Sequence, residues 1–152
     1  EDCLYAVQEE QKGTGHAVQC VSKVINDTDR DKLAIILCGD TPCLRAETLH
    51  LFLRHFESSN LDLLVLSTPV RDPSGYGRIL RDKNNRFTCI REHKDCDANE
   101  LQVNEINTGI YVGRLGLFLD LLQEVKDDNQ QGEFYLKLNY RLAKTRIGHI
   151  GH

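Results

Sequence analysis

Residues 33–42 read LAIILCGDTP and set the expected architecture of the chain. The unbroken apolar run at 33–38 is too short for a confident helix and rich in Ile and Leu, which is typical of a central strand covered on both faces. Gly39 permits close backbone approach, and Pro42 stops the hydrogen-bonded ladder. The Asp40 carboxylate is therefore expected at the carboxyl end of a buried strand, where open α/β sheets bind ligands. Capping of the next helix or turn is the alternative role for Asp40.

Composition is that of a soluble globular protein. The chain has 152 residues, of which 40% are hydrophobic and 28% are charged, so we expect one domain over residues 1–152. The net charge of -4, without a basic stripe, argues against nucleic-acid binding. No apolar run reaches membrane-spanning length and the N-terminus lacks the basic region of a signal peptide, so we expect no membrane association and a cytoplasmic location.

Cysteine and methionine usage adds two expectations. The sequence has 6 cysteines and none of them forms a C-x-x-C pair, which argues for reduced thiols and against a structural zinc site. Methionine is absent, including at position 1, so we expect the chain to begin inside a longer protein.

Strand and helix patterns alternate along the chain. This alternation predicts an α/β fold with a mainly parallel sheet and flanking helices, and a hairpin beside it. The predicted strands are residues 4–8, 33–38, 61–66, 77–81, 87–92 and 105–112, and the predicted helices are residues 46–58, 115–125 and 133–144, with a further helix opening at Gly13. A helix start at Gly13 would direct free N–H groups towards the ligand edge, although a tight turn is the default explanation of the two glycines of GTG.

Five motifs follow one another in a fixed order. They are GTGHAVQ at 13–19, CGDTPCL at 38–44, DPSGYGRI at 72–79, EHKDCD with EINTGIY at 92–97 and 105–111, and QGEFYL at 131–136. Together they resemble the uridyltransferase domain of the bifunctional bacterial N-acetylglucosamine-1-phosphate uridyltransferase and glucosamine-1-phosphate acetyltransferase. The resemblance covers about residues 4–138 and implies the Rossmann-like nucleotide-diphospho-sugar transferase fold, here without its first strand.

The resemblance also implies a reaction. A uridylyl group would pass from UTP to N-acetylglucosamine 1-phosphate, giving UDP-N-acetylglucosamine and pyrophosphate, with Mg²⁺ as cofactor. This is amino-sugar nucleotide synthesis for peptidoglycan and cell-wall precursors, and a homo-oligomer is expected for the full-length protein. The alternative is a sugar-nucleotide-binding module without turnover.

Nucleotide and metal roles are carried over by the resemblance. Gln11, Gly13, Thr14 and Gly39 match the nucleotide-binding positions, and the side-chain amide of Gln11 offers the donor and acceptor that a uracil edge needs. Asp40 matches the catalytic carboxylate that holds magnesium, a hard cation that often takes one or two carboxylates together with phosphate oxygens and water.

Sugar binding is implied for Thr14, Gly77, Glu92, Asn107 and Tyr135. Gly77 would give close approach to its backbone N–H, and Glu92 and Asn107 would bind hydroxyl and acetamido groups. Two structural alternatives remain open. Glu92 could be a solvated strand end, and Asn107 could be an amide that stabilises a bulge.

Parts of the family pattern have no match in this sequence. The G-x-G-T-R-M loop with its Lys, the second metal ligand, the Thr beyond the QGEFYL motif and the hexapeptide repeats of the acyltransferase β-helix domain are not found. Because the missing loop carries the cationic clamp on the triphosphate, we expect the chain as written to be a partial nucleotidyltransferase domain with little or no activity.

Overall fold

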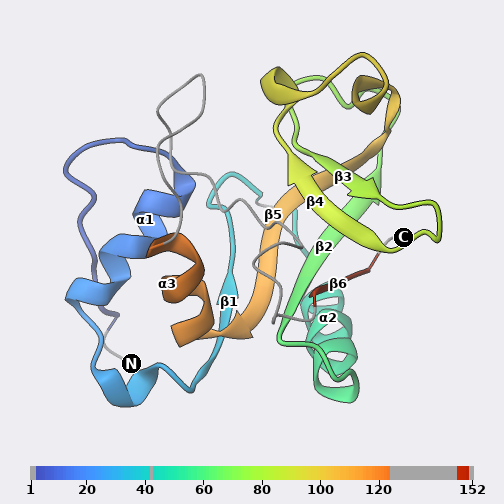
Figure 1. Ribbon diagram of the computed structural model, residues 1–152. Helices are drawn as coiled ribbons and strands as arrows, with labels where there is room; N and C mark the ends of the chain where they lie inside the picture. Colours follow the sequence, from blue (N-terminus) through green and yellow to red (C-terminus); the bar gives the residue numbers. More distant parts are fainter. Residues whose placement is uncertain (1–2, 42, 124–146, 151–152) are drawn as a thin grey trace. The chain divides into compact units, whose positions relative to one another are not determined.

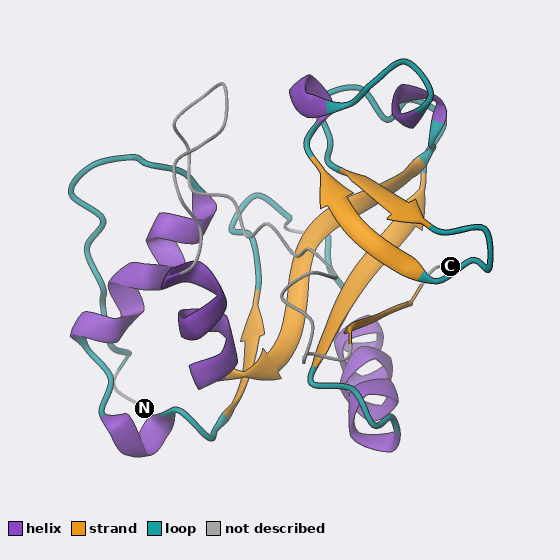
Figure 2. Ribbon diagram, viewed as in Figure 1, coloured by secondary structure: helices purple, strands orange, loops and turns teal. Residues whose placement is uncertain are grey.

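The computed structural model describes residues 3–41, 43–123 and 147–150 (Figure 1). These residues fall into two compact units. Unit 1 comprises residues 3–33 and 114–123, and unit 2 comprises residues 34–41, 43–113 and 147–150. Helices and strands both occur, as Figure 2 shows, so the expected α/β class is confirmed.

Unit 2 is built on a sheet with the strand order β4-β3-β5-β2-β6, and β1 pairs with β5 in addition. The strands are β1 (Leu33–Ile36), β2 (Leu63–Pro69), β3 (Arg78–Arg81), β4 (Phe87–Arg91), β5 (Glu105–Arg114) and β6 (Ile147–Ile150). The predicted hairpin is confirmed, because β3 and β4 pair antiparallel.

Three details of the sequence-based prediction are wrong. β1 is not the buried strand expected at residues 33–38, because it ends at Ile36, none of its residues is buried, and Leu33 and Leu37 are exposed. The sheet was expected to be mainly parallel, yet among the described ladders β5 runs antiparallel to both β2 and β3, and the parallel ladder is that of β2 with β6. Periodicity reports which side chains are buried and not in which direction a strand runs. Residues 4–8 are not a strand either. Leu4, Tyr5 and Val7 are exposed, and a short apolar run becomes a strand only where a neighbouring strand pairs with it.

The core of unit 2 joins helix α2 (Ala46–Ser58) to β2 and β5. The bounds of α2 match those of the helix predicted at residues 46–58. The prediction was possible because apolar residues four apart lie on the same face of a helix. The buried members of this core are Phe52, Phe56, Leu64, Leu66, Ile110 and Val112. Leu64 lies opposite Val112 and Leu66 lies opposite Ile110, so α2 packs on two cross-strand pairs on one face of the sheet.

Unit 1 pairs helix α1 (Thr14–Cys20) with helix α3 (Leu115–Gln123). The Gln19 Nε2 donates to the Leu122 carbonyl at 2.7 Å, and the Arg30 Nη2 lies 2.5 Å from Asp120 Oδ1. The predicted helix at 133–144 lies outside the described residues. Within the described part of the chain, no helix is long and apolar enough to cross a membrane.

Replacement of Leu64 tests the core. Leu64→Ala is expected to lower the free energy of unfolding by about 2–5 kcal/mol, because Leu64 is fully buried between α2 and β5 and its loss leaves a cavity. Urea denaturation measures the change. Leu51→Ala is the matched control, since Leu51 lies on α2 with 52% of its surface exposed and should change stability little. Equal losses in the two variants would contradict the assigned core.

Candidate functional site

A break in register between β2 and β5 shapes the candidate site. Leu66 lies opposite Ile110, whereas the next residue of β2, Ser67, lies opposite Asn107, so Thr108 and Gly109 form a bulge. The Thr108 hydroxyl donates to the Leu66 carbonyl at 2.7 Å, and Gly109 has a φ of 75°. Only glycine adopts this left-handed conformation at little cost, so Gly109 allows the bulge to form.

The end of β1 meets this bulge. A Cβ atom on Gly109 would lie 2.7 Å from the Cys38 Sγ, and the Cys38 thiol donates to the Gly109 carbonyl at 3.7 Å. Burial, together with the negative charge of Asp40, raises the pKa of the Cys38 thiol. The negative charge of Asp40 therefore acts on the Cys38 thiol, which lies beside the bulge. The Asp40 side chain is exposed at the turn after β1.

Asn107 is held by the same bulge. Its Oδ1 accepts the Gly109 N–H at 3.1 Å, its Nδ2 donates to the Tyr111 hydroxyl at 2.7 Å, and its backbone N–H donates to the Gly77 carbonyl at 2.8 Å. The bulge-stabilising role considered for Asn107 is thus observed. A sugar-binding role remains compatible with it, because a primary amide has four hydrogen-bonding positions and two of them are used here.

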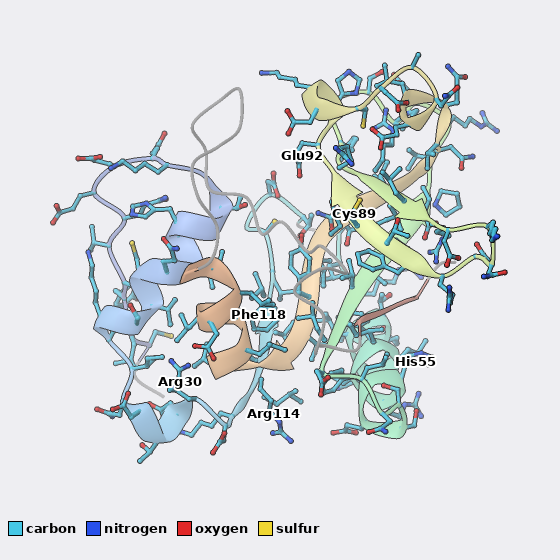
Figure 3. All side chains as sticks on the ribbon, in the orientation of Figure 1. Arg30, His55, Cys89, Glu92, Arg114 and Phe118 are labelled. Atoms are coloured by element: carbon cyan, nitrogen blue, oxygen red, sulfur yellow. The ribbon has the colours of Figure 1, made fainter. Side chains whose placement is uncertain are left out.

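Glu92, labelled in Figure 3, follows strand β4 of the β3–β4 hairpin, and it lies against Gly77. Gly77 is buried, and a Cβ atom on it would lie 3.0 Å from Glu92 Oε1 and 3.1 Å from Ile90 Cγ2. The Glu92 carboxylate therefore fills the space beside Gly77 where a side chain would lie, and the approach of a sugar to the Gly77 N–H stays a prediction. Glu92 is half-buried and its carbonyl accepts the Asp95 N–H at 2.9 Å, so it begins a 3₁₀ turn and is not a fully solvated strand end.

Sequence reasoning assigned no role to Arg78, which the structure buries almost completely behind Gly77. Its Nη1 donates to the Pro73 carbonyl at 2.6 Å and to the Tyr76 carbonyl, and its Nη2 lies 3.3 Å from His93 Nδ1. Arg78 thereby fastens the loop before Gly77 to the residue after Glu92. The signal for it was an arginine inside the GYGRI motif at the start of a strand.

Four other predicted residues belong to unit 1 or lie outside the described residues. Gln11, Gly13 and Thr14 belong to unit 1, where Gln11 and Thr14 are exposed. Gly13 has a φ of 88° and precedes α1, and its carbonyl accepts the Gln8 Nε2 at 3.0 Å. Tyr135 lies outside the described residues.

Within unit 2 the contacts form one series. Glu92 lies against Gly77, the Gly77 carbonyl accepts the Asn107 N–H, and Asn107 accepts the Gly109 N–H. Gly109 in turn lies against Cys38, two residues before Asp40.

The donor set around Asp40 limits which metal site is feasible. In the described ranges no group of three or more His, Cys, Asp or Glu side chains could hold an ion. Gly39 beside it faces open space, since nothing lies within 4 Å of a Cβ placed there. Such an exposed single carboxylate fits Mg²⁺ that takes its other ligands from phosphate oxygens and water, and does not fit a cage made only of protein ligands.

Comparison with known proteins identifies the class. The model of the nucleotidyl transferase family matches residues 2–149, so the chain belongs to the nucleotidyl transferase family. A crystal structure of a protein from Bacillus anthracis, assigned as a glucose-1-phosphate thymidylyltransferase and bound to sucrose, superposes with a TM-score of 0.67. That match covers 98% of this chain and 56% of the other at 18% identity, and therefore supports the fold alone.

More similar relatives narrow the resemblance. The bifunctional protein GlmU of Exiguobacterium sp. is 44% identical over 140 residues, which are 92% of this chain and 31% of the relative. The bifunctional protein GlmU of Staphylococcus carnosus is 42% identical over 136 residues, which are 90% of this chain and 30% of the relative. These matches confirm the resemblance seen in the five motifs. The chain spans about a third of the length of these curated relatives.

The fit between Gly109 and Cys38 can be tested by stability. Gly109→Ala is expected to lower the free energy of unfolding by about 2–4 kcal/mol, because it adds an overlap with Cys38 Sγ to the strain of a left-handed alanine. In a Cys38→Ala background the overlap is relieved and the strain remains, so the loss should be smaller. Denaturation of all four proteins in the double-mutant cycle measures the difference.

Gly39→Ala is the matched control, because a Cβ there meets nothing within 4 Å. It should leave stability nearly unchanged. An equal effect of Gly109→Ala with and without the Cys38 sulfur would contradict the packing described here.

Proposed function

We propose that this chain carries the sugar-binding part of an enzyme that transfers a uridylyl group from UTP to N-acetylglucosamine 1-phosphate, yielding UDP-N-acetylglucosamine and pyrophosphate. The observation that carries the proposal is the contact of three predicted sugar-binding residues within unit 2. Glu92 lies against Gly77, and Gly77 accepts the backbone N–H of Asn107. Membership of the nucleotidyl transferase family and the similarity to GlmU proteins support it.

Each of these groups suits a sugar. The Glu92 carboxylate accepts hydrogen bonds from hydroxyl groups, and the Asn107 amide can both donate and accept. The resemblance implies that the sugar also contacts the backbone N–H of Gly77. Tyr135 and Thr14 would complete the sugar contacts, as the resemblance implies.

The nucleotide side of the reaction rests on other residues. Gln11, Gly13, Thr14 and Gly39 would contact the nucleotide, and Asp40 would hold Mg²⁺ together with the phosphates. The metal would supply neutralisation of the charge that develops on the transferring phosphoryl group. The protein residues bind and orient the two substrates, because in-line transfer depends mainly on positioning.

The cellular setting follows from this chemistry. The substrates are charged, water-soluble sugar phosphates and nucleotides, so a cytoplasmic enzyme that feeds peptidoglycan synthesis fits the proposal. A homo-oligomer of the full-length protein is part of the same proposal.

A second candidate is a module that binds the sugar nucleotide without turnover. The observation that favours it is that Asp40 is the single carboxylate assigned to the metal, and among the described residues it belongs to no group of three or more His, Cys, Asp or Glu side chains that could hold an ion. Release of pyrophosphate from UTP and N-acetylglucosamine 1-phosphate by the full-length protein separates the candidates, because a partial domain alone is expected to turn over little. Turnover by the full-length protein supports the enzyme, and binding without turnover supports the module.

Calorimetric titration with UDP-N-acetylglucosamine, with and without Mg²⁺, tests the site itself. Glu92→Gln is expected to weaken binding about tenfold to a hundredfold, because a hydrogen bond to a charged group contributes about 1.5–3 kcal/mol. Asp40→Asn is expected to remove the part of the affinity that depends on Mg²⁺.

Glu57→Gln provides the matched control, because Glu57 is exposed on α2 and should bind like the unaltered chain. Binding that is insensitive to Glu92→Gln, or equally weakened by Glu57→Gln, would refute the proposed sugar site.

A further inference from the structure

The Asn107 side chain is oriented by two neighbours on its own strand. A primary amide offers two acceptor lone pairs and two N–H groups. The Gly109 N–H occupies one lone pair of Oδ1, and the Tyr111 hydroxyl accepts one hydrogen of Nδ2. One lone pair and one N–H of the amide are left after these two contacts.

The two contacts do not have equal roles. A backbone N–H can only donate, so the contact at Gly109 determines that Oδ1 faces the bulge. The opposite edge, Nδ2, must then face Tyr111, whose hydroxyl can accept. Tyr111 is 6% exposed, and burial raises the pKa of its phenol, so the hydroxyl stays protonated and neutral. The amide is therefore held at both ends and cannot turn over without placing one donor against another.

The bulge brings these residues together. Asn107 and Tyr111 are four apart on β5 and are separated by the two bulged residues and Ile110. Tyr111 is opposite Val65, in the buried part of the sheet, so the ring is fixed by packing before it orients the amide.

We propose that Tyr111 is a positioning residue that presents the remaining N–H and lone pair of Asn107 to the acetamido group of the sugar. This inference rests on the proposed function. A secondary amide carries one N–H and one carbonyl, which is the complement of what Asn107 has left. The ammonium group of a non-acetylated amino sugar has only donors. An oriented amide therefore discriminates between the two sugars, as sites built around fixed hydrogen bonds do.

Tyr111→Phe is the direct test, because it removes the hydroxyl and keeps the ring. Binding of N-acetylglucosamine 1-phosphate, glucosamine 1-phosphate and UTP is measured by calorimetry. The preference for the acetylated sugar should fall about tenfold, since one hydrogen bond contributes about 1 kcal/mol or slightly more. Affinity for UTP should not change. Tyr5→Phe is the matched control, because Tyr5 is 82% exposed in unit 1.

A double-mutant cycle shows whether Tyr111 acts through Asn107. In an Asn107→Ala background, Tyr111→Phe should have no further effect on sugar preference. Additive effects, an unchanged preference, or an equal loss of affinity for both sugars and UTP would overturn the inference.

A measurement without ligand separates this inference from the proposed function. In the unaltered chain the two Nδ2 protons of Asn107 should give separate, slowly exchanging NMR resonances, and Tyr111→Phe should accelerate their exchange with water. If the unaltered chain binds no sugar nucleotide, the proposed function fails and the sugar preference assigned to Tyr111 fails with it. Exchange of the Nδ2 protons that is slower in the unaltered chain than in Tyr111→Phe would still show that Tyr111 positions the amide. Sugar binding with exchange that is insensitive to Tyr111→Phe would overturn the inference alone.

Discussion

The left-handed residue in the middle of β5 is the constraint on which unit 2 depends. Because Gly109 accepts a φ of 75°, the strand can skip two residues against β2 and resume its pairing at Asn107. The missing side chain also leaves room for the Cys38 sulfur at the end of β1. One glycine thus brings the turn that carries Asp40 next to the strand that carries Asn107.

On either side of the bulge, β5 serves different purposes. Ile110 and Val112 lie in the core under α2, where burial of each side chain contributes about 1.5–3 kcal/mol. Before the bulge, Glu105 accepts two hydrogen bonds from Arg81, at 2.8 and 2.7 Å, and one from Ser67 at 2.5 Å. Apolar burial therefore stabilises one end of the strand, and a satisfied polar network fixes the direction of the other. Asn107 lies where these two regions of the strand meet.

Local patterns in the sequence predicted the elements better than their pairing. The apolar periodicity of residues 46–58 was sufficient to predict α2, and the two strand patterns at 77–81 and 87–92 to predict the hairpin. Gly77 was predicted as a point of close approach from its motif. The antiparallel direction of β5 and the exposure of residues 4–8 depend on partners distant in sequence, which a period of two cannot reveal. The contact of Tyr111 with Asn107 depends on the bulge, so it too required the fold.

The structural and ligand-binding interpretations of the site residues are not competitors. Two of the four hydrogen-bonding positions of the Asn107 amide contact Gly109 and Tyr111. These two contacts fix the orientation of the amide, and therefore the directions of its remaining N–H and lone pair. Arg78 shows the same logic behind Gly77. A buried guanidinium is costly unless its donors are satisfied. Here carbonyls of the 73–76 loop accept from Nη1, whereas the buried Nε has no hydrogen-bond partner among the described residues. That arrangement holds the loop by two hydrogen bonds next to the position where Gly77 meets Glu92. A site that distinguished sugars by single hydrogen bonds would need groups held in this way, because an amide free to turn over would accept either sugar.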